Sequence, residues 1–452
     1  MEPVIRILEV ELENFKNVGK GKVSFPASQN FSTERADIIG LYGQNGSGKT
    51  AMVEAFTVLK RFLEGAKFPT AYNHLIFSGK THASLKFVFL IEEVEEKHYL
   101  EYKISFEQVN EKIKLKSEEM RFKKIEKGIR MKELVSYDSQ KNTEFLTVRN
   151  MKKLNNLDAI VDLKVNKSLS EKEKTSYLFR KETLEILERH DLKEEYKYLS
   201  LLKYSFLNNL HILTNDNSGL IYANIVMPIA FQMESSEFEV GGTFRLAFNE
   251  AKVIPKNLFT IANDIFHQIN IVLSKIIPGL TIELNNLGNE TDSKGKEGVR
   301  VELLSNRDGV KLPFWCESDG IKKLFSILST LVTMFNKQTS CVVIDELDAG
   351  IFEYLLGEII ETLHDYGSGQ LLFTSHNLRL LEVLPKECLF FTTTNPENRY
   401  IKLTGLKQTN NIRDVYIRAV QLGGQSEEIY KETDAFYIRQ AFRKAGNSGE
   451  SN

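Results

Sequence analysis

The stretch LYGQNGSGKT at residues 41–50 constrains this chain more than any other feature. Its spacing, Gly-x4-Gly-Lys-Thr, is that of a phosphate-binding loop, in which backbone N–H groups turn toward phosphate oxygens. The apolar run ADIIGLYG before the loop predicts a buried strand, and the pattern over residues 50–63 predicts an amphipathic helix after it. Strand, glycine loop and helix in this order form the context that the motif requires. The sequence therefore predicts an α/β fold with a nucleotide site.

The residues of this loop have separate expected roles. The N-terminus of the helix that starts near Lys49 points at the phosphates, and Lys49 supplies positive charge to the β and γ phosphates. The hydroxyl of Thr50 is a candidate ligand for Mg²⁺. The glycines allow the backbone to approach the phosphates. We expect ATP to be held by the whole loop, namely Gly43, Asn45, Gly46, Ser47, Gly48, Lys49 and Thr50.

A second motif, CVVIDELDAG, occupies residues 341–350. Its four apolar residues predict a buried strand whose carboxyl end presents Asp345 and Glu346 together. An acidic cluster at a strand edge would explain these residues without any chemistry. Beside a phosphate loop, however, Asp345 is expected to hold Mg²⁺, and Glu346 is expected to orient and deprotonate the attacking water.

A third motif, QLLFTSHNLRLLE, covers residues 370–382 and places His376 just after an apolar strand. A single histidine is usually structural. This strand, however, is expected to lie beside the strand that ends at Asp345, and ligands gather at the carboxyl ends of parallel strands. We therefore expect His376 to donate a hydrogen bond to the γ phosphate and so sense its presence.

A fourth motif, ESDGIKKLFSIL at residues 317–328, begins an amphipathic helix. Ser318 and Gly320 can form an anion site with the free N–H groups of the helix N-terminus, or Ser318 can be a simple N-cap. The motif alone does not decide between the two. The order of all four motifs favours the anion site, because a phosphate loop, a Ser-x-Gly helix, an Asp-Glu strand and a histidine strand follow one another in ABC-type ATPase heads.

The bulk composition adds few constraints on partners. The 452 residues include 59 basic and 61 acidic residues, so any nucleic-acid site would have to be local. The three cysteines have no metal-ligand spacing. We find no signal peptide and no apolar run near the length of a membrane span, so we expect a cytoplasmic protein with reduced cysteines and no membrane contact.

The remaining stretches indicate how the chain is organised. Strand patterns occur at 4–15, 21–25, 83–91 and 98–107, and the Lys/Glu-rich stretch after them predicts an antiparallel sheet with a solvated face. A nucleic-acid groove is the alternative for that stretch. Two further strands are expected at 279–286 and 298–305, and a disordered tail at 446–452. The expected parts are 1–149 and 276–405 for the two halves of an ATPase head, 150–275 for a mainly helical insertion, and 406–452 for a helical C-terminal segment.

Together with LENFKN at residues 12–17, these motifs resemble those of the RecF/SMC/OLD branch of the ABC ATPases. More closely, the chain resembles the compact bacterial ATPase subunits of phage-defence systems of the PARIS, Septu and retron-linked types. The resemblance covers the first 60 residues and about 310–380. It implies an α/β, ABC-type P-loop ATPase head with a mostly parallel core sheet, an N-terminal antiparallel sheet and a helical insertion.

The resemblance also implies an assembly. Two copies would bind head to tail around two ATP molecules, as a homodimer or within a larger homo-oligomer, with Ser318 and Gly320 of one copy facing the phosphate loop of the other. Lys16 matches a basic position near the nucleotide, and Asp348 matches the loop through which the two sites communicate. Two features depart from the family pattern: the signature reads Glu-Ser-Asp-Gly rather than Leu-Ser-Gly-Gly, and no glutamine loop is placed.

Three functions remain open from the sequence. The first is a slow ATPase that senses a trigger or acts as a scaffold and controls a separately encoded effector, such as a nuclease or toxin. It is favoured because the roughly 75 residues after His376 are too few for the Toprim domain of OLD-type nucleases. The second is a DNA-clamping repair ATPase with a basic face at 112–132. The third is a nuclease whose active site lies within 150–275.

Overall fold

The core of the head is a six-stranded sheet that brings together segments from the whole length of the chain. The computed structural model describes residues 3–68, 74–94, 96–110, 112–140, 157–223, 225–234, 239–291, 295–405 and 411–447. The strand order of the core sheet is β18-β17-β3-β16-β15-β8, and all neighbours are parallel except β17 and β18. The strands are β3 (Asp37–Tyr42), β8 (Leu210–Leu213), β15 (Cys341–Ile344), β16 (Gln370–Thr374), β17 (Leu389–Thr392) and β18 (Tyr400–Ile401).

The central strands are short apolar runs because both faces of the sheet are covered. Every residue of β3, β15, β16 and β17 is buried. Their carboxyl ends lie at one edge, where the phosphate loop follows β3, Asp345 follows β15 and His376 follows β16. The strand before His376 (β16) was predicted to lie beside the strand before Asp345 (β15). This is confirmed, because the two strands pair directly from Cys341–Gln370 to Ile344–Phe373.

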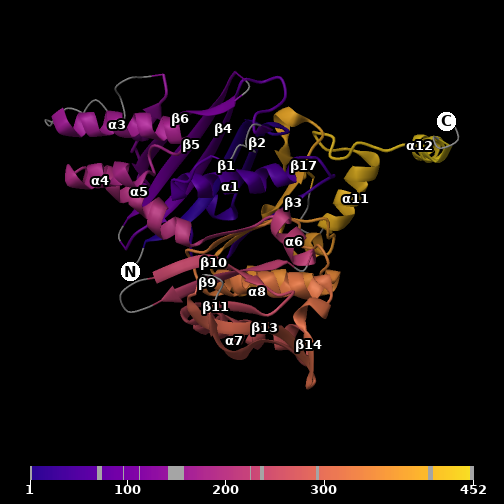
Figure 1. Ribbon diagram of the computed structural model, residues 1–452. Helices are drawn as coiled ribbons and strands as arrows, with labels where there is room; N and C mark the ends of the chain where they lie inside the picture. Colours follow the sequence, from indigo (N-terminus) through magenta and orange to yellow (C-terminus); the bar gives the residue numbers. More distant parts are fainter. Residues whose placement is uncertain are drawn as a thin grey trace.

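A second, antiparallel sheet covers the N-terminal part of the head (Figure 1). Its strand order is β2-β1-β4-β5-β6-β7. The Lys/Glu-rich stretch forms β6, which pairs antiparallel with β5 and β7, and its residues are mostly exposed or half-buried, so the predicted antiparallel sheet with one solvated face is confirmed. The strands are β1 (Val4–Phe15), β2 (Val18–Ser24), β4 (His82–Glu92), β5 (Lys97–Val109), β6 (Lys112–Lys124) and β7 (Lys132–Asp138).

Helix α1 (Lys49–Glu64) lies between the two sheets. Ten of its residues are buried, and one hydrophobic core joins them to residues of β1, β4 and β5 on one side and of β15 and β16 on the other. The helix ends at Gly65, whose left-handed conformation (φ 68°) lets its N–H reach the carbonyls of Arg61 and Phe62. Movement of α1 is therefore coupled to both sheets.

The described part of the region from 150 to 275 is mainly helical, as the sequence predicted, but it also contributes four strands. Its first part is helical, with α3 (Leu157–Glu173), α4 (Lys181–Arg189), α5 (Lys193–Ser200) and a π-helical turn at Leu201–Phe206. The second part supplies β8 to the core sheet and, after α6 (Asn215–Tyr222), three further strands. These are β9 (Val226–Glu234), β10 (Glu239–Ala247) and β11 (Lys252–Pro255).

A third layer carries the Ser-x-Gly helix. Strands β11, β12 (Leu280–Thr291), β13 (Glu297–Arg307) and β14 (Val310–Pro313) form an antiparallel sheet, which confirms the predicted strand pair over 279–305. Helix α7 (Lys256–Ile276) packs on this sheet, and α8 (Asp319–Asn336) lies between it and the core sheet (Figure 1). Because α8 contacts both layers, Lys322 and Lys323 are buried along with its apolar residues.

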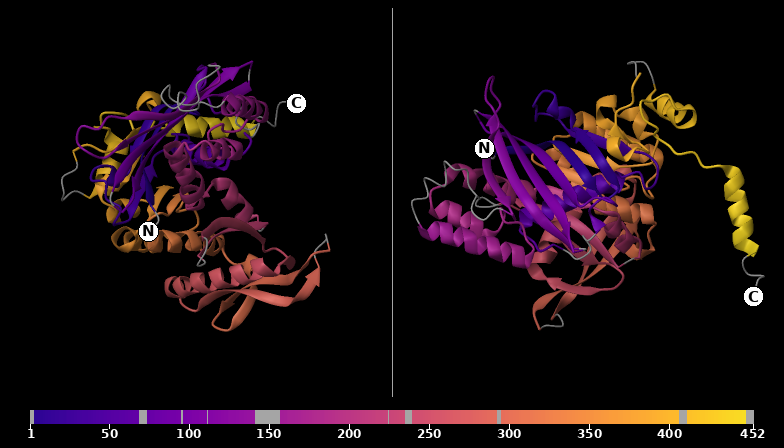
Figure 2. Two further views of the ribbon diagram at one scale, coloured as in Figure 1. Left: turned by 90° about the vertical axis from the view of Figure 1, so that its left-hand side faces the viewer. Right: turned by 90° about the horizontal axis from the view of Figure 1, so that it is seen from above.

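The C-terminal part packs against the core sheet and then leaves it. It comprises α9 (Glu353–Tyr366), α10 (Leu380–Val383), α11 (Ile412–Leu422) and α12 (Ala435–Asn447). Helix α12 stands away from the rest of the molecule (Figures 1 and 2). Of the predicted disordered tail, residues 446 and 447 belong to α12, and the rest lies outside the described residues. Among the described residues, no helix is long and apolar enough to cross a membrane.

Candidate functional site: the phosphate loop and its neighbours

The phosphate loop owes its shape to three glycines in the left-handed region of backbone space. The φ angles of Gly43, Gly46 and Gly48 are 149°, 76° and 97°. Gly43 has a second constraint, because a Cβ atom there would lie 1.7 Å from the Thr392 hydroxyl. The loop therefore turns tightly against β17 and then directly enters α1, as the motif predicts.

Lys49 lies in the loop and is 7% exposed. Its ammonium donates hydrogen bonds to the carbonyls of Gly43 (2.8 Å) and Gln44 (3.1 Å). Burial lowers its pKa, an effect that the carboxylates of Asp345, Glu346 and Asp348 oppose. A buried cation held only by neutral carbonyls has unused capacity for an anion, which is what a triphosphate supplies.

Asp345 is the most buried carboxylate at the site, with 1% of its surface exposed. The Thr374 hydroxyl donates to Asp345 Oδ1 (2.5 Å) and accepts the backbone N–H of Glu346 (2.7 Å). Asp345 Oδ2 has no hydrogen-bond partner among the described residues. A buried carboxylate oxygen without a partner is costly, so this donor set fits a cation such as Mg²⁺.

Glu346 occupies a strained position at the end of β15. Its φ angle is 48°, in the left-handed region that non-glycine residues seldom adopt. The ammonium of Lys323, from α8, donates to the Glu346 carbonyl (3.3 Å). Burial lowers the pKa of Lys323, and Glu346 and Asp345 oppose that shift. Lys323 thus ties the Ser-x-Gly helix to the acidic pair, a contact that the amphipathic pattern gave no reason to expect.

These groups surround a cavity of about 470 Å³ at the carboxyl edge of the core sheet. The volume lies within the range of about 300–1,000 Å³ that is common for small-molecule sites. Eight residues named from the sequence line it: Lys16, Asn45, Gly46, Gly48, Lys49, Thr50, Asp345 and Glu346. Three further residues line the cavity and were not predicted from the sequence: Asn17, Ala51 and His74.

Of the lining residues that were not predicted, Asn17 lies within a recognised motif, next to Lys16, whereas His74 does not. Lys16 forms an ion pair with Glu54 of α1, which holds it beside the phosphate loop. Its neighbour Asn17 donates its amide N–H to the Gly46 carbonyl (2.6 Å). Asn17 could have been found from its place in the LENFKN motif. His74 lies far from every motif and carries no sequence signal.

His376 and Asp348 lie next to this cavity, but neither is among its lining residues. The backbone N–H of His376 donates to Asp348 Oδ2 (3.1 Å), which joins the loop after β16 to the loop after β15. Partial burial and the positive charge of Lys49 lower the pKa of the His376 ring, which favours the neutral form. Neutral histidine can still donate one hydrogen bond to a phosphate.

Ser318 and Gly320 also lie outside the cavity of their own chain. Ser318 is exposed and caps α8, since its hydroxyl accepts the N–H of Ile321 at 3.4 Å. Gly320 approaches the loop after β15 so closely that a Cβ atom there would lie 2.0 Å from the Gly350 carbonyl oxygen. Both residues therefore have a structural role within one chain.

Residues that follow β16 in the chain also contact the phosphate loop, and these contacts were not predicted from the sequence. The buried Tyr400 donates its hydroxyl to the Gly48 carbonyl (2.7 Å). The Ser47 and Thr392 hydroxyls share a hydrogen bond (2.5 Å). The backbone N–H of Lys431 donates to the Gln44 side chain (3.1 Å). Thr392, Tyr400 and Lys431 thus hold the loop through contacts from the later part of the chain.

Within the described residues, no group of three or more His, Cys, Asp or Glu side chains is placed to share a metal ion. The two expected Mg²⁺ ligands, Thr50 and Asp345, nevertheless line one cavity. Mg²⁺ commonly keeps several waters and takes only one or two protein ligands beside bound phosphates.

The parallel core sheet, phosphate loop, Asp-Glu strand and histidine strand define an α/β P-loop ATPase head of the ABC type, as the sequence predicted. The chain belongs to a family of AAA domains described as putative AbiEii toxin, type IV toxin–antitoxin system, whose profile matches residues 38–382. None of the curated proteins matches it.

Solved structures with a similar fold have low sequence identity to this chain. The SMC head bound to the C-winged helix domain of ScpA is 15% identical, with a TM-score of 0.44 over 88% of this chain and 97% of that one. The SMC head domain from Thermotoga maritima is 14% identical (TM-score 0.38, 88% and 99% covered). The ATP complex of the recombination mediator RecF is 12% identical (TM-score 0.34, 83% and 94% covered).

Proposed function

We propose that this protein binds ATP with Mg²⁺ in the 470 Å³ cavity and hydrolyses it slowly, as a switch that controls a separately encoded effector. The observation that carries the proposal is the convergence of Lys49 and Thr50 with Asp345 and Glu346 around one cavity. Two of these groups have unused bonding capacity: the Lys49 ammonium is held by carbonyls, and Asp345 Oδ2 has no partner among the described residues.

Each residue has one step in the proposed reaction. Lys49 exchanges its bonds to the Gly43 and Gln44 carbonyls for bonds to the β and γ phosphates. Thr50 and Asp345 hold Mg²⁺, which neutralises phosphate charge when bound. Glu346 orients a water and takes its proton as the water attacks the γ phosphate and the bond between that phosphate and the departing ADP breaks. His376 donates a hydrogen bond to the γ phosphate and, through its backbone bond to Asp348, links that contact to the loop after β15.

The assembly that completes this site is a head-to-tail homodimer, alone or within a larger homo-oligomer. Ser318 and Gly320 lie outside the cavity of their own chain, so a second copy would have to supply them to ATP. Large apolar side chains near them support such an interface, because Trp315, Phe352 and Tyr354 are 46%, 68% and 60% exposed. Asp348 and Gly350, which precede Phe352, would lie between the two sites.

The biological role that we favour is a sensor or scaffold subunit of a bacterial, antiphage defence system. The family description supports this role, since it names a toxin and a toxin–antitoxin system. The effector would be a nuclease or toxin on another chain. The DNA-clamp alternative needs basic side chains on the face at 112–132 that are free to contact phosphates. On that face, Arg121 and Lys124 of β6 are paired with Glu119, Glu96 and Glu126, which disfavours this alternative.

The test uses the Glu346→Gln protein, which should keep ATP bound, co-expressed with the neighbouring genes and purified with ATP and Mg²⁺. We expect a stoichiometric protein partner, identified by mass spectrometry, that is absent when Lys49→Ala is used instead. Bound nucleic acid without a protein partner would replace the effector proposal with the DNA-clamp function. Equal ATP binding by wild type and Lys49→Ala would refute the assignment of the nucleotide site.

A further inference from the structure

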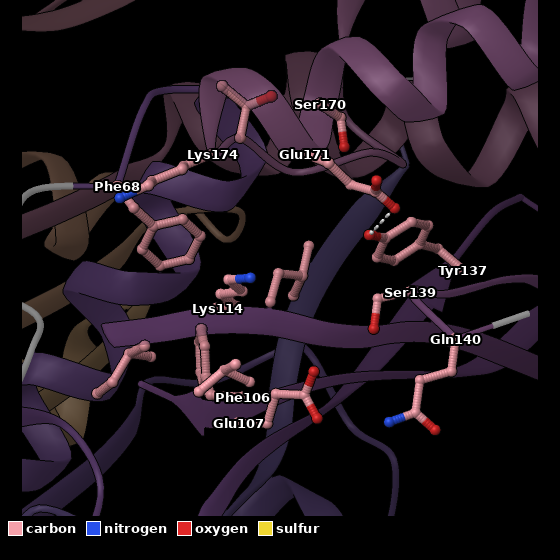
Figure 3. Close-up of a pocket in the computed structure, with 14 residues that line it drawn as sticks. Phe68, Phe106, Glu107, Lys114, Tyr137, Ser139, Gln140, Ser170, Glu171 and Lys174 are labelled. Atoms are coloured by element: carbon pink, nitrogen blue, oxygen red, sulfur yellow. Dashed lines mark hydrogen bonds between the residues drawn. The ribbon is translucent and has the colours of Figure 1, made fainter. Parts of the chain in front are cut away.

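A second cavity, of about 430 Å³, lies between the antiparallel sheet and the end of α3 (Figure 3). None of its lining residues belongs to the nucleotide site. Phe68 lies on one side of the opening, and Tyr137, Ser139 and Gln140 lie on the other (Figure 3). Aromatic rings therefore lie on both sides of the cavity, with polar groups beside them, an arrangement that is common in small-molecule sites.

Two hydroxyls in this cavity have no hydrogen-bond partner among the described residues. Ser170 is 1% exposed and its Oγ is unpaired, and the Oγ of Ser139 is likewise inaccessible to solvent and unpaired. The neighbouring Tyr137 hydroxyl, by contrast, donates to Glu171 (3.2 Å). A buried polar group without a hydrogen-bond partner is unfavourable, so both hydroxyls point to a group that would bond them.

The charges around the cavity restrict the ligand. Glu107 and Glu171 are balanced by Lys114 and Lys174, so the wall as a whole favours neither an anion nor a cation. The apolar and aromatic part suits a flat ring, while the serine hydroxyls and the Gln140 amide can each donate or accept a hydrogen bond. A flat ring with several donors and acceptors on its edge is a nitrogen heterocycle.

We propose that this cavity binds a neutral nitrogen heterocycle of nucleobase or nucleoside size, and that the ligand regulates the ATPase. The regulatory part rests on the proposed ATPase function, whereas the binding part does not. The cavity would then be a regulatory site, at which binding of the ligand changes the rate of ATP hydrolysis.

An aromatic cluster connects this cavity to the phosphate loop. The Phe68 ring meets the rings of Phe106 (centroids 5.6 Å apart) and Phe62 (4.6 Å apart) edge to face. Phe62 belongs to α1, whose first residue is Lys49. A helix of this length spans about 24 Å, so it joins the aromatic cluster to the phosphate loop. A ligand that displaces Phe68 or Phe106 would therefore act on α1 and, through it, on the phosphate loop.

Binding is tested on the full-length protein with adenosine, guanosine, cytidine and uridine as separate probes, at up to about 1 mM, by isothermal titration calorimetry. A non-hydrolysable ATP analogue with Mg²⁺ blocks the nucleotide site throughout. We expect at least one probe to bind in the presence of the analogue and to bind the Lys49→Ala protein equally well. If no probe binds, or if the analogue or Lys49→Ala abolishes binding, the proposed ligand site is refuted.

The location is tested with matched substitutions in α3. Ser170→Leu fills the cavity, whereas Ser168→Leu adds the same side chain on the exposed face of the helix. We expect Ser170→Leu to weaken probe binding at least tenfold and Ser168→Leu to leave it unchanged. Ser139→Val provides an independent change should Ser170→Leu fail to fold. Unchanged binding in a folded cavity variant would overturn the location.

Regulation has its own readout, which keeps the two proposals separable. In wild type and Ser168→Leu, the bound probe should change the ATP turnover rate at least twofold, and in Ser170→Leu it should not. Probe binding by a protein without ATPase activity would refute the proposed function and leave the ligand site standing. Probe binding with an unchanged turnover rate would refute the regulatory link alone.

Discussion

Replacing Gly320 by alanine should push the start of helix α8 away from the loop after strand β15. The added Cβ would lie 2.0 Å from the Gly350 carbonyl oxygen, and Cβ atoms essentially never come within 3.0 Å of such an atom. The two segments must therefore separate by about 1 Å. The neighbouring Lys323 would move with α8 and would strain its hydrogen bond to the Glu346 carbonyl.

The size of the effect follows from two opposing terms. Overpacking of this kind costs about 1–3 kcal/mol, and exchanging a helical glycine for alanine returns up to about 1 kcal/mol. We expect a net loss of about 1–2 kcal/mol in the free energy of unfolding. A displacement of about 1 Å at a reacting group can lower turnover on the order of 100-fold. ATP binding should persist, because neither Gly320 nor Gly350 lines the cavity.

Urea denaturation, ATP titration and steady-state phosphate release measure these three quantities. Gly219→Ala in α6 is the matched control, because it is also a helical glycine but, among the described residues beyond its chain neighbours and its own helix backbone, no atom lies within 4 Å of its added Cβ. The control should be at least as stable as wild type and turn over ATP normally. If Gly320→Ala behaves like Gly219→Ala in both stability and turnover, the close approach to Gly350 is not a constraint on this protein.

Three further predictions concern other parts of the molecule. Lys49→Ala should abolish ATP binding in a calorimetric titration, while Glu346→Gln should bind ATP but release phosphate about 100-fold more slowly or worse; equal turnover by Glu346→Gln and wild type would remove Glu346 from its role. Ser318→Arg should prevent ATP-dependent dimerisation in sedimentation experiments yet leave monomer binding intact, and normal turnover in this variant would mean that Ser318 is only a helix cap. Glu118, which is fully buried, accepts hydrogen bonds from Tyr102, Ser176 and Tyr177 (2.6, 2.6 and 2.7 Å), and burial raises its pKa. A raised pKa in the folded state means that its contribution to stability is fully present below the ordinary pKa and declines as the pH rises through the folded value. The stability advantage of wild type over Glu118→Gln in urea denaturation should therefore shrink as the pH is raised from 4, and an advantage that grows with pH would contradict this assignment.

The parts of the site predicted from the sequence share one property. The strands before the phosphate loop, before Asp345 and before His376 are each an apolar run that ends in polar residues. Parallel strands place such ends at one edge, so the pattern predicts a shared site even when the segments are far apart along the chain. The position of these residues followed from local pattern plus one rule of sheet geometry.

The parts that were missed depend on long-range packing. Strand β8 has only four residues, LHIL, and a run of that length does not distinguish a strand from a buried helix segment. The amphipathic pattern predicts that Lys323 lies on the solvent-exposed face of α8. It is buried instead, because other layers cover α8 on two sides. Tyr400 and Lys431 reach the phosphate loop through tertiary contacts that no local pattern encodes.

The placement of β3 also has a consequence for how the protein is made. Its two neighbours in the sheet, β16 and β17, are synthesised about 330 residues later. At about 5–20 residues per second, a ribosome needs roughly 15–70 s to cover that distance. During that interval the antiparallel strands β1, β2 and β4 to β7 can pair with one another, but the sheet that positions the phosphate loop cannot close. A chain that stops before β16 therefore lacks both sheet neighbours of β3, so the phosphate loop can take up its folded position only after residues 370–392 have been synthesised.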